Sequence, residues 1–164
     1  MNLTWDKRTR EVAYLLNPAF CGEVIRRCIE AYQQTSRQSM PFPLLFLILP
    51  IVLHKSTRET MPRTARGHMY SWLQENPHIK VGFAQRARNL LQVSKETQAF
   101  LMQFNTLTVD VQAELSVSRR RRPRIPALEQ GEVSDCFKKA ELLGKWFANA
   151  GSSITIYTMW GVKP

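Results

Sequence analysis

The densest group of chemically capable side chains is an arginine run, Arg119, Arg120, Arg121, Arg122 and Arg124, which places five cations within seven residues. A guanidinium matches the geometry of a phosphate group, and a cationic run neutralises phosphates without needing a fixed register. Two other interpretations stay open. The run also suits a solvated loop, since like charges repel and Pro123 and Pro126 resist regular structure, or a contact with an acidic patch on a partner protein.

The overall charge of the chain favours the same kind of partner as this run. The chain has 23 Lys and Arg against 13 Asp and Glu, a net charge of +10, and without the five arginines it would be +5 (10 − 5). A strong positive charge favours an anionic partner, whether nucleic acid, an acidic protein surface or a membrane face. Half of the excess is therefore local.

Residues with catalytic potential are scattered. His54, His68 and His78 do not have the spacing of metal ligands, and Gly144-Lys145 lacks the upstream glycine and the following Ser or Thr of a phosphate-binding loop. We therefore expect a protein that is not an enzyme and that uses neither a metal nor a cofactor. Distant residues can still assemble a reaction centre, so an enzyme remains the least supported alternative.

The three cysteines, an odd number, argue against a disulfide framework and for a reducing compartment. Cys21 and Cys28 lie seven residues apart, which on a helix is a rise of about 10.5 Å, beyond disulfide reach. We expect buried, unreactive thiols.

The start of the chain lacks the apolar core of a signal peptide. The apolar stretch 41–53 holds three prolines and is shorter than the roughly 20 residues of a membrane span. The expectation is a cytoplasmic protein with no membrane partner.

Residues 1–75 are expected to form N-terminal helices. A short helix is predicted over 6–16, ending before Pro18. An amphipathic helix follows, whose apolar positions recur every four residues at Phe20, Val24, Cys28 and Tyr32.

The apolar segment that begins near Met40 predicts a helix enclosed by other helices, with a kink or break at Pro50. Ser56 with Glu59 is typical of a capping box, and Thr64 is the expected cap of the next helix.

Residues 76–118 predict a winged-helix-like segment. Asn76-Pro77 favours a helix start, Gln92-Val93 a break, and Ser94 the cap of a second helix. Apolar and polar residues then alternate from Leu107 to Val117, which predicts a small β-hairpin. Helix, turn, helix and hairpin is the order of a winged helix-turn-helix.

The second of these helices would occupy the position that reads DNA, and Asn105 is expected to end it in the left-handed conformation. Its Lys95 and the preceding helix's Arg88 are candidate DNA contacts together with the arginine run, through phosphates. The signal for reading sequence is weak, because Glu96 offsets Lys95.

Residues 119–131 are expected to form a basic linker, and 132–164 a C-terminal helix with an apolar tail, the helix ending at Gly151. The tail suits either an extended segment or a short helix capped by Ser152 or Ser153. Its candidate partner-interface residues are Ile156, Tyr157, Met159 and Trp160. They equally suit closure of the chain's own core.

The predicted fold is one domain, 1–164, mainly α with a small β-hairpin, in which the winged-helix-like segment is embedded among helices. The length supports a single core.

Several strings also resemble a known family, the middle component of bacterial three-component ABC-type ATPase systems, which includes the small accessory subunit of Lamassu anti-phage defence. The strings are LLNPAFC (15–21), PFPLLFLILPIVLHKSTRETMP (41–62), SWLQENP (71–77), VGFAQRARNL (81–90), KAELLGKWFANAG (139–151) and IYTMWGVKP (156–164). They span nearly the whole chain.

This resemblance implies a non-catalytic accessory subunit beside an SMC-like ATPase and an effector, often a nuclease, so that ATP hydrolysis and DNA cutting belong to the partners. It assigns no role to the arginine run. The alternative from the residues alone is a free-standing winged-helix DNA-binding regulator.

Overall fold

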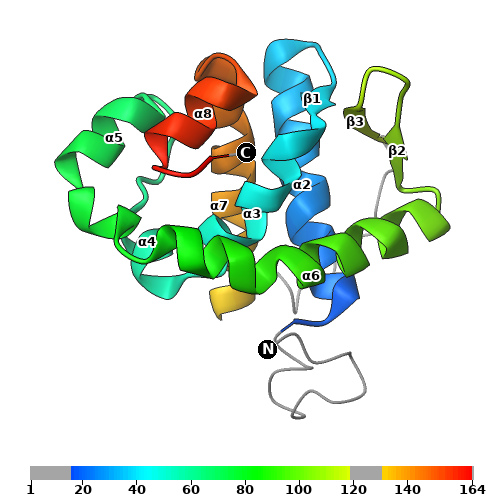
Figure 1. The fold of residues 1–164 in the computed structure, drawn as a ribbon, viewed down its shortest axis with the longest axis horizontal. Coiled ribbons are helices and arrows are strands. Elements are labelled where there is room, and N and C mark those ends of the chain that lie inside the picture. The colour runs from blue at the N-terminus through cyan, green and yellow to red at the C-terminus, as the bar shows by residue number, and fades with distance from the viewer. Residues whose placement is uncertain (1–15, 119–130, 164) are drawn as a thin grey trace.

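Helices make up most of the structure, a computed structural model that describes residues 16–118 and 131–163 (Figure 1). The α-helices of this part are α2 (Pro18–Ser36), α3 (Leu45–Val52), α4 (Lys55–Thr60), α5 (Met69–Glu75), α6 (Phe83–Gln103), α7 (Gly131–Asn149) and α8 (Ser153–Met159). The shorter elements are the 3-10 helices η2 (Phe42–Leu44) and η3 (Pro77–Lys80) and the strands β1 (Met40–Pro41), β2 (Leu107–Val109) and β3 (Glu114–Val117). The prediction of a mainly helical fold is confirmed.

Helices α2 and α7 lie side by side and form the centre of the fold (Figure 1). The predicted apolar face of α2 is confirmed, since Val24, Cys28 and Tyr32 are buried. A Cβ atom placed on Gly144 of α7 would stand 2.1 Å from the carbonyl oxygen of Cys28. The two backbones approach so closely here that only glycine fits.

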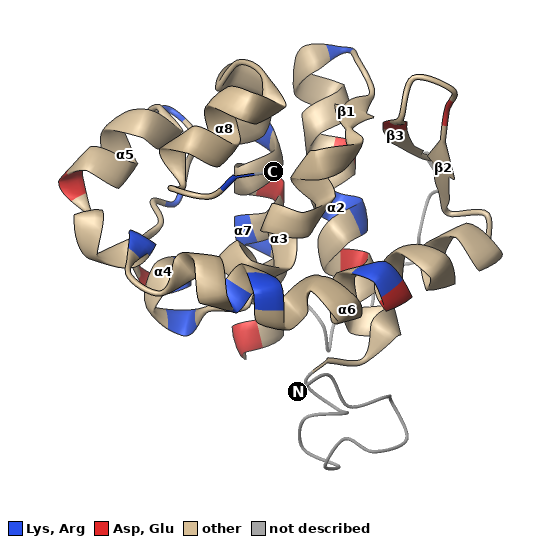
Figure 2. Cartoon of the chain, viewed as in Figure 1, with Lys and Arg blue, Asp and Glu red and all other residues tan. Residues whose placement is uncertain are grey.

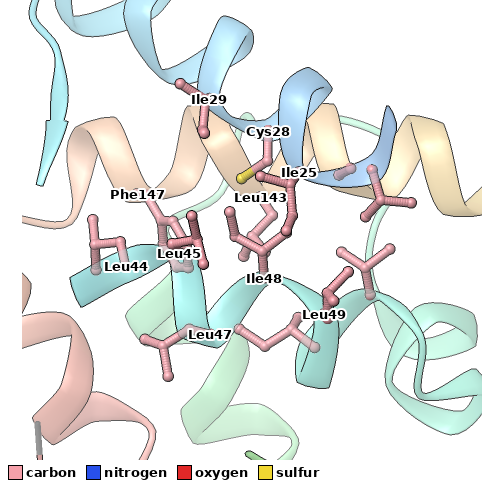
Figure 3. Close-up of a cluster of buried hydrophobic side chains, with 14 of the residues drawn as sticks. Ile25, Cys28, Ile29, Leu44, Leu45, Leu47, Ile48, Leu49, Leu143 and Phe147 are labelled. Atoms are coloured by element: carbon pink, nitrogen blue, oxygen red, sulfur yellow. The ribbon is translucent and has the colours of Figure 1, made fainter. Parts of the chain in front are cut away.

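Helix α3 is enclosed by α2, α6 and α7 as its composition predicts, and each of its residues except Phe46 is buried. Its Ile48 faces Ile25 of α2 and Leu143 of α7 (Figure 3). The structure shows no break at Pro50. The helix continues to Val52, and the N–H of Leu53 still donates to the carbonyl of Leu49 at 2.9 Å.

The capping box predicted from Ser56 and Glu59 is wrong, because α4 begins two residues earlier, with His54 at the N-cap position. The His54 Nδ1 atom lies 2.8 Å from the hydroxyl of Thr57. This start turns Thr57 and Arg58 inward, and burial of that face outweighs the local capping signal.

The next two predicted helix starts are also shifted. Thr64 lies in an exposed loop, and α5 begins after His68. Asn76-Pro77 starts only the 3-10 turn η3, and α6 begins at Phe83, after Gly82 in the left-handed region (φ 69°).

The main correction concerns α6, which runs without interruption through Gln92-Val93. Ser94, the predicted cap, is buried in the middle of the helix, and the Thr97 hydroxyl donates to the carbonyl of Val93 at 2.7 Å. The small polar side chains Ser94 and Thr97 lie on the inner face of α6, where close packing favours a small side chain. The helix-turn-helix part of the winged-helix prediction is therefore wrong.

The predicted hairpin is confirmed, with β2 antiparallel to β3 and Leu107 opposite Val117. Asn105 adopts the predicted left-handed conformation (φ 52°). The hairpin gains a third strand that the sequence did not indicate, because β1 pairs with β3 through Met40 and Leu115, giving the order β1-β3-β2. The hairpin is thus part of a small sheet that joins residues far apart in the chain.

The C-terminal helix is confirmed as α7, and Gly151 follows it with φ 92°. The tail takes the helical alternative, since the Ser152 hydroxyl accepts from the N–H of Thr155 at 3.2 Å and caps α8. Apart from Leu16, the helix expected over 6–16 lies outside the described residues.

Within residues 16–118 and 131–163, no helix combines the length and the apolar character needed to cross a bilayer.

Candidate functional site

Two of the candidate DNA contacts lie together on the outer face of α6. Arg88 and Lys95 are both exposed and seven residues apart, which is two turns and about 10.5 Å of helix axis, so they point in nearly the same direction. Figure 2 shows that basic residues recur along α6. The arginine run, Arg119–Arg122 and Arg124, lies outside the described residues.

The packing of α6 explains why this face is not covered by the other described helices. Its inner side places Phe83, Val93 and Leu101 in the core against α2 and α3. The opposite side then faces solvent. On this side, exposed Leu91 lies between the two cations and exposed Met102 lies beyond Lys95. The face is cationic with apolar patches.

Two cationic side chains can each neutralise a phosphate, and their two-turn separation lets both contact one backbone. The neighbouring Glu96 limits this charge, and it accepts a hydrogen bond from Gln92 at 3.3 Å. The arrangement suits phosphate contact rather than base reading, because donors for base edges are few.

Several other cations are committed to the fold, which the sequence did not reveal. On α2, Arg26 contacts Glu23 at 2.9 Å and Glu30 at 2.8 Å, and the hydrogen bond to Glu23 raises the pKa of Arg26. Arg27 bonds Glu23 and also Glu141 at 2.9 Å, which ties α2 to α7. These charges contribute to packing.

Arg58 makes a similar connection from α4. It is buried and donates to the carbonyl of Val52 at 2.9 Å, while Asp135 at 3.3 Å and Glu132 bind it from α7. The sequence does carry a weak signal for these carboxylates, because Glu132 and Asp135 fall in the first turns of a helix, where acidic side chains are favoured.

Backbone carbonyls hold two more cations. The Lys139 ammonium donates to Met61 and Pro62 at 2.8 and 2.9 Å, and burial lowers its pKa. Arg86 donates to the carbonyl of Val81 at 2.9 Å, so this arginine of α6 is not available to a ligand.

The residues considered for catalysis are not brought together. His68 and His78 are exposed, and His54 stands at the N-cap position of α4. Across the described ranges, no three His, Cys, Asp or Glu side chains gather as a metal-binding group. Gly144 serves the α2–α7 crossing instead of a phosphate loop.

The three cysteines are reduced and buried, as predicted. Burial raises the pKa of the Cys28 thiol far above its usual range and raises that of Cys136. Since the thiolate is the reactive form, both burial and protonation suppress reaction.

We therefore expect native protein to leave all three thiols unmodified by an aromatic disulfide reagent at neutral pH, and urea-unfolded protein to react at all three. Absorbance of the released thiolate measures this. Rapid labelling of the folded chain would contradict the burial of Cys21, Cys28 and Cys136.

The proposed interface residues of the tail are used within the chain. Ile156, Tyr157 and Trp160 are buried, and the Tyr157 hydroxyl donates to the carbonyl of Pro43 at 2.6 Å. Met159 is half-buried. The alternative interpretation, in which these side chains close the core, accounts for their positions.

These features define a small helical module that presents a cationic surface and holds several of its ionic side chains in structural contacts. A family model described as ABC-three component (ABC-3C) system Middle Component 3 matches residues 5–164, and the chain belongs to this family. Membership makes it the middle component of a three-component ABC system and implies partner subunits. Neither the curated proteins nor the solved structures contain a match to it.

Proposed function

We propose that the chain is a non-catalytic accessory subunit that joins an SMC-like ATPase to an effector, a nuclease, in an antiviral defence complex of the Lamassu kind. The observation that carries this proposal is the family match over nearly the whole chain. The helical frame supports it, because helices braced by the Arg27–Glu141 and Arg58–Asp135 pairs offer fixed surfaces to two partners at once.

Assembly is the direct test of this role. The chain is co-expressed with the products of its neighbouring genes, each carrying a separate tag, and purified at low salt. We expect one complex that contains the ATPase, the effector and this chain, and loss of the ATPase–effector association when this chain is omitted. Elution of the chain alone beside an intact ATPase–effector pair would overturn the bridging role.

Contact with DNA is the second part of the proposal. The outer face of α6, with Arg88 and Lys95, supplies phosphate contacts, and the arginine run is a further candidate. The alternative of a free-standing winged-helix regulator loses support, because α6 has no turn that would set a recognition helix apart.

Changing Arg88→Gln together with Lys95→Gln is expected to weaken binding of the complex to random-sequence duplex DNA. The plot of log affinity against log salt has a negative slope, and its magnitude should decrease by about two, one for each phosphate that is no longer neutralised. Fluorescence anisotropy at several salt concentrations measures the slope.

The matched control replaces two exposed lysines away from α6, Lys55→Gln with Lys138→Gln. It removes the same charge, so an equal change of slope in both variants would indicate a general charge effect. An unchanged slope for the α6 variant would remove this face from the DNA contact.

A further inference from the structure

A pocket of about 510 Å³ opens between the loop before α5 and the ends of α7 and α8. Its volume lies in the range of sites that enclose a small ligand or a side-chain anchor. The pocket shares no residue with the outer face of α6, and none of its lining residues belongs to the ion pairs of α2, α4 and α7 described above.

The pocket has an apolar floor and a polar rim. Met69, Trp146 and Met159 provide apolar surface, and Arg66 and Asn149 provide hydrogen-bonding groups. Apolar and polar side chains thus line the same cavity, which is typical of sites that orient a bound group.

The apolar wall is fixed before anything binds. The indole Nε1–H of Trp146 donates to the carbonyl of Gly67 at 2.7 Å, and the Trp146 ring packs on Trp72 with centroids 5.0 Å apart. A preformed wall lowers the entropic cost of binding.

The charge around the pocket has one sign. The residues that line it, within 65–71 and 146–150 and at Met159, include no Asp or Glu and carry one cation, Arg66. Figure 2 shows acidic residues elsewhere on the molecule, including the far end of α5. Arg66 is exposed and forms no ion pair with another described residue.

We propose that this pocket binds a segment of a partner subunit in which an apolar or aromatic side chain stands next to a carboxylate. The inference rests on the proposed accessory role, and it places one docking site at the α5–α7–α8 end of the molecule. The apolar side chain enters against Trp146 and Met159, and Arg66 pairs with the carboxylate. Tyr70, more than half exposed at the rim, adds an aromatic contact of the kind that dominates interface energy.

The apolar floor distinguishes this occupant from DNA. A phosphate backbone would satisfy Arg66 but would bring no apolar group to Met69, Trp146 and Met159. A peptide segment with both groups satisfies the whole pocket. DNA binding is therefore the competing outcome of the test.

The test compares Arg66→Glu and Tyr70→Ala with the unchanged chain in binding to the co-expressed ATPase and effector. We expect each variant to lower the affinity for one partner by about tenfold, the effect of removing one interface anchor. Tyr70→Ala keeps the charge, so it separates pocket contact from general electrostatics. Biolayer interferometry with each purified partner gives the affinities, and circular dichroism checks that the variants fold.

Lys138→Glu is the control, since Lys138 is exposed on α7 and does not line the pocket. It should leave both affinities unchanged. Equal partner affinity for Arg66→Glu, Tyr70→Ala and the unchanged chain would overturn the pocket proposal while leaving the accessory role intact. A loss of DNA affinity without a loss of partner affinity would overturn it in favour of a nucleic-acid contact. If the unchanged chain binds neither partner, the accessory role itself fails and the pocket proposal with it.

Discussion

Trp160→Ala is expected to lower the free energy of unfolding by about 3–5 kcal/mol, the usual cost of truncating a buried tryptophan. Trp160 is 1% exposed and packs on Phe83 of α6 and Trp72 of α5, with ring centroids 4.6 and 6.1 Å apart. Its removal would open a cavity where three segments of the chain meet. Urea unfolding of the isolated chain, followed by circular dichroism, measures the change.

The control for this prediction is Ile154→Ala in the same tail. Ile154 is 68% exposed, so its truncation should change the unfolding free energy by less than about 0.5 kcal/mol. If Trp160→Ala were as stable as the unchanged chain and weakened only partner binding, the tail would be an interface after all.

The second large effect is expected for Gly144→Ala. This substitution should lower the free energy of unfolding by about 3 kcal/mol or more, which is the upper end of the usual cost of overpacking a core. The added methyl carbon would meet the Cys28 carbonyl oxygen at 2.1 Å and the Ala31 side chain at 3.0 Å. Relief requires α2 and α7 to separate, and the core between them is closely packed. The midpoint of urea unfolding should fall accordingly.

Gly67→Ala is its matched control, because a Cβ atom there has nothing within 4 Å. The same substitution should therefore be tolerated at 67 and not at 144. Equal stability of the two variants would contradict the close approach of α2 to α7.

The helices with strong apolar periodicity could be predicted from sequence, and α2 and α7 fall where their patterns place them. The error in α6 has a physical cause. Gln92-Val93 and Ser94 are locally typical of a break and a cap, whereas tertiary packing buries Ser94 within one continuous helix.

Strand β1 was missed because it holds two residues, one of them Pro41, and owes its existence to pairing with β3. The cap predicted at Ser56 was wrong for the same reason. The burial of Thr57 and Arg58 sets the start of α4, with His54 at the N-cap position. Short elements take their limits from neighbours that a single sequence does not reveal.

The candidate site could be predicted only in part. Exposed cations at Arg88 and Lys95 follow from helical periodicity once α6 is known to be one helix. The pocket combines residues from 65 to 159, and the separation between Arg66 and Met159 in sequence gives no local signal. Its acid-free character can be read from the sequence only after the structure shows which segments line it.

The contact between α2 and α7 also sets an order for biosynthesis. The apolar face of α2, with Val24 and Cys28, is covered by a helix that starts at Gly131. A nascent chain that has left the ribosome only through residue 118 therefore exposes that face to water. Such surfaces aggregate or recruit chaperones, so the cell must shelter the first helices until the last part of the chain is made.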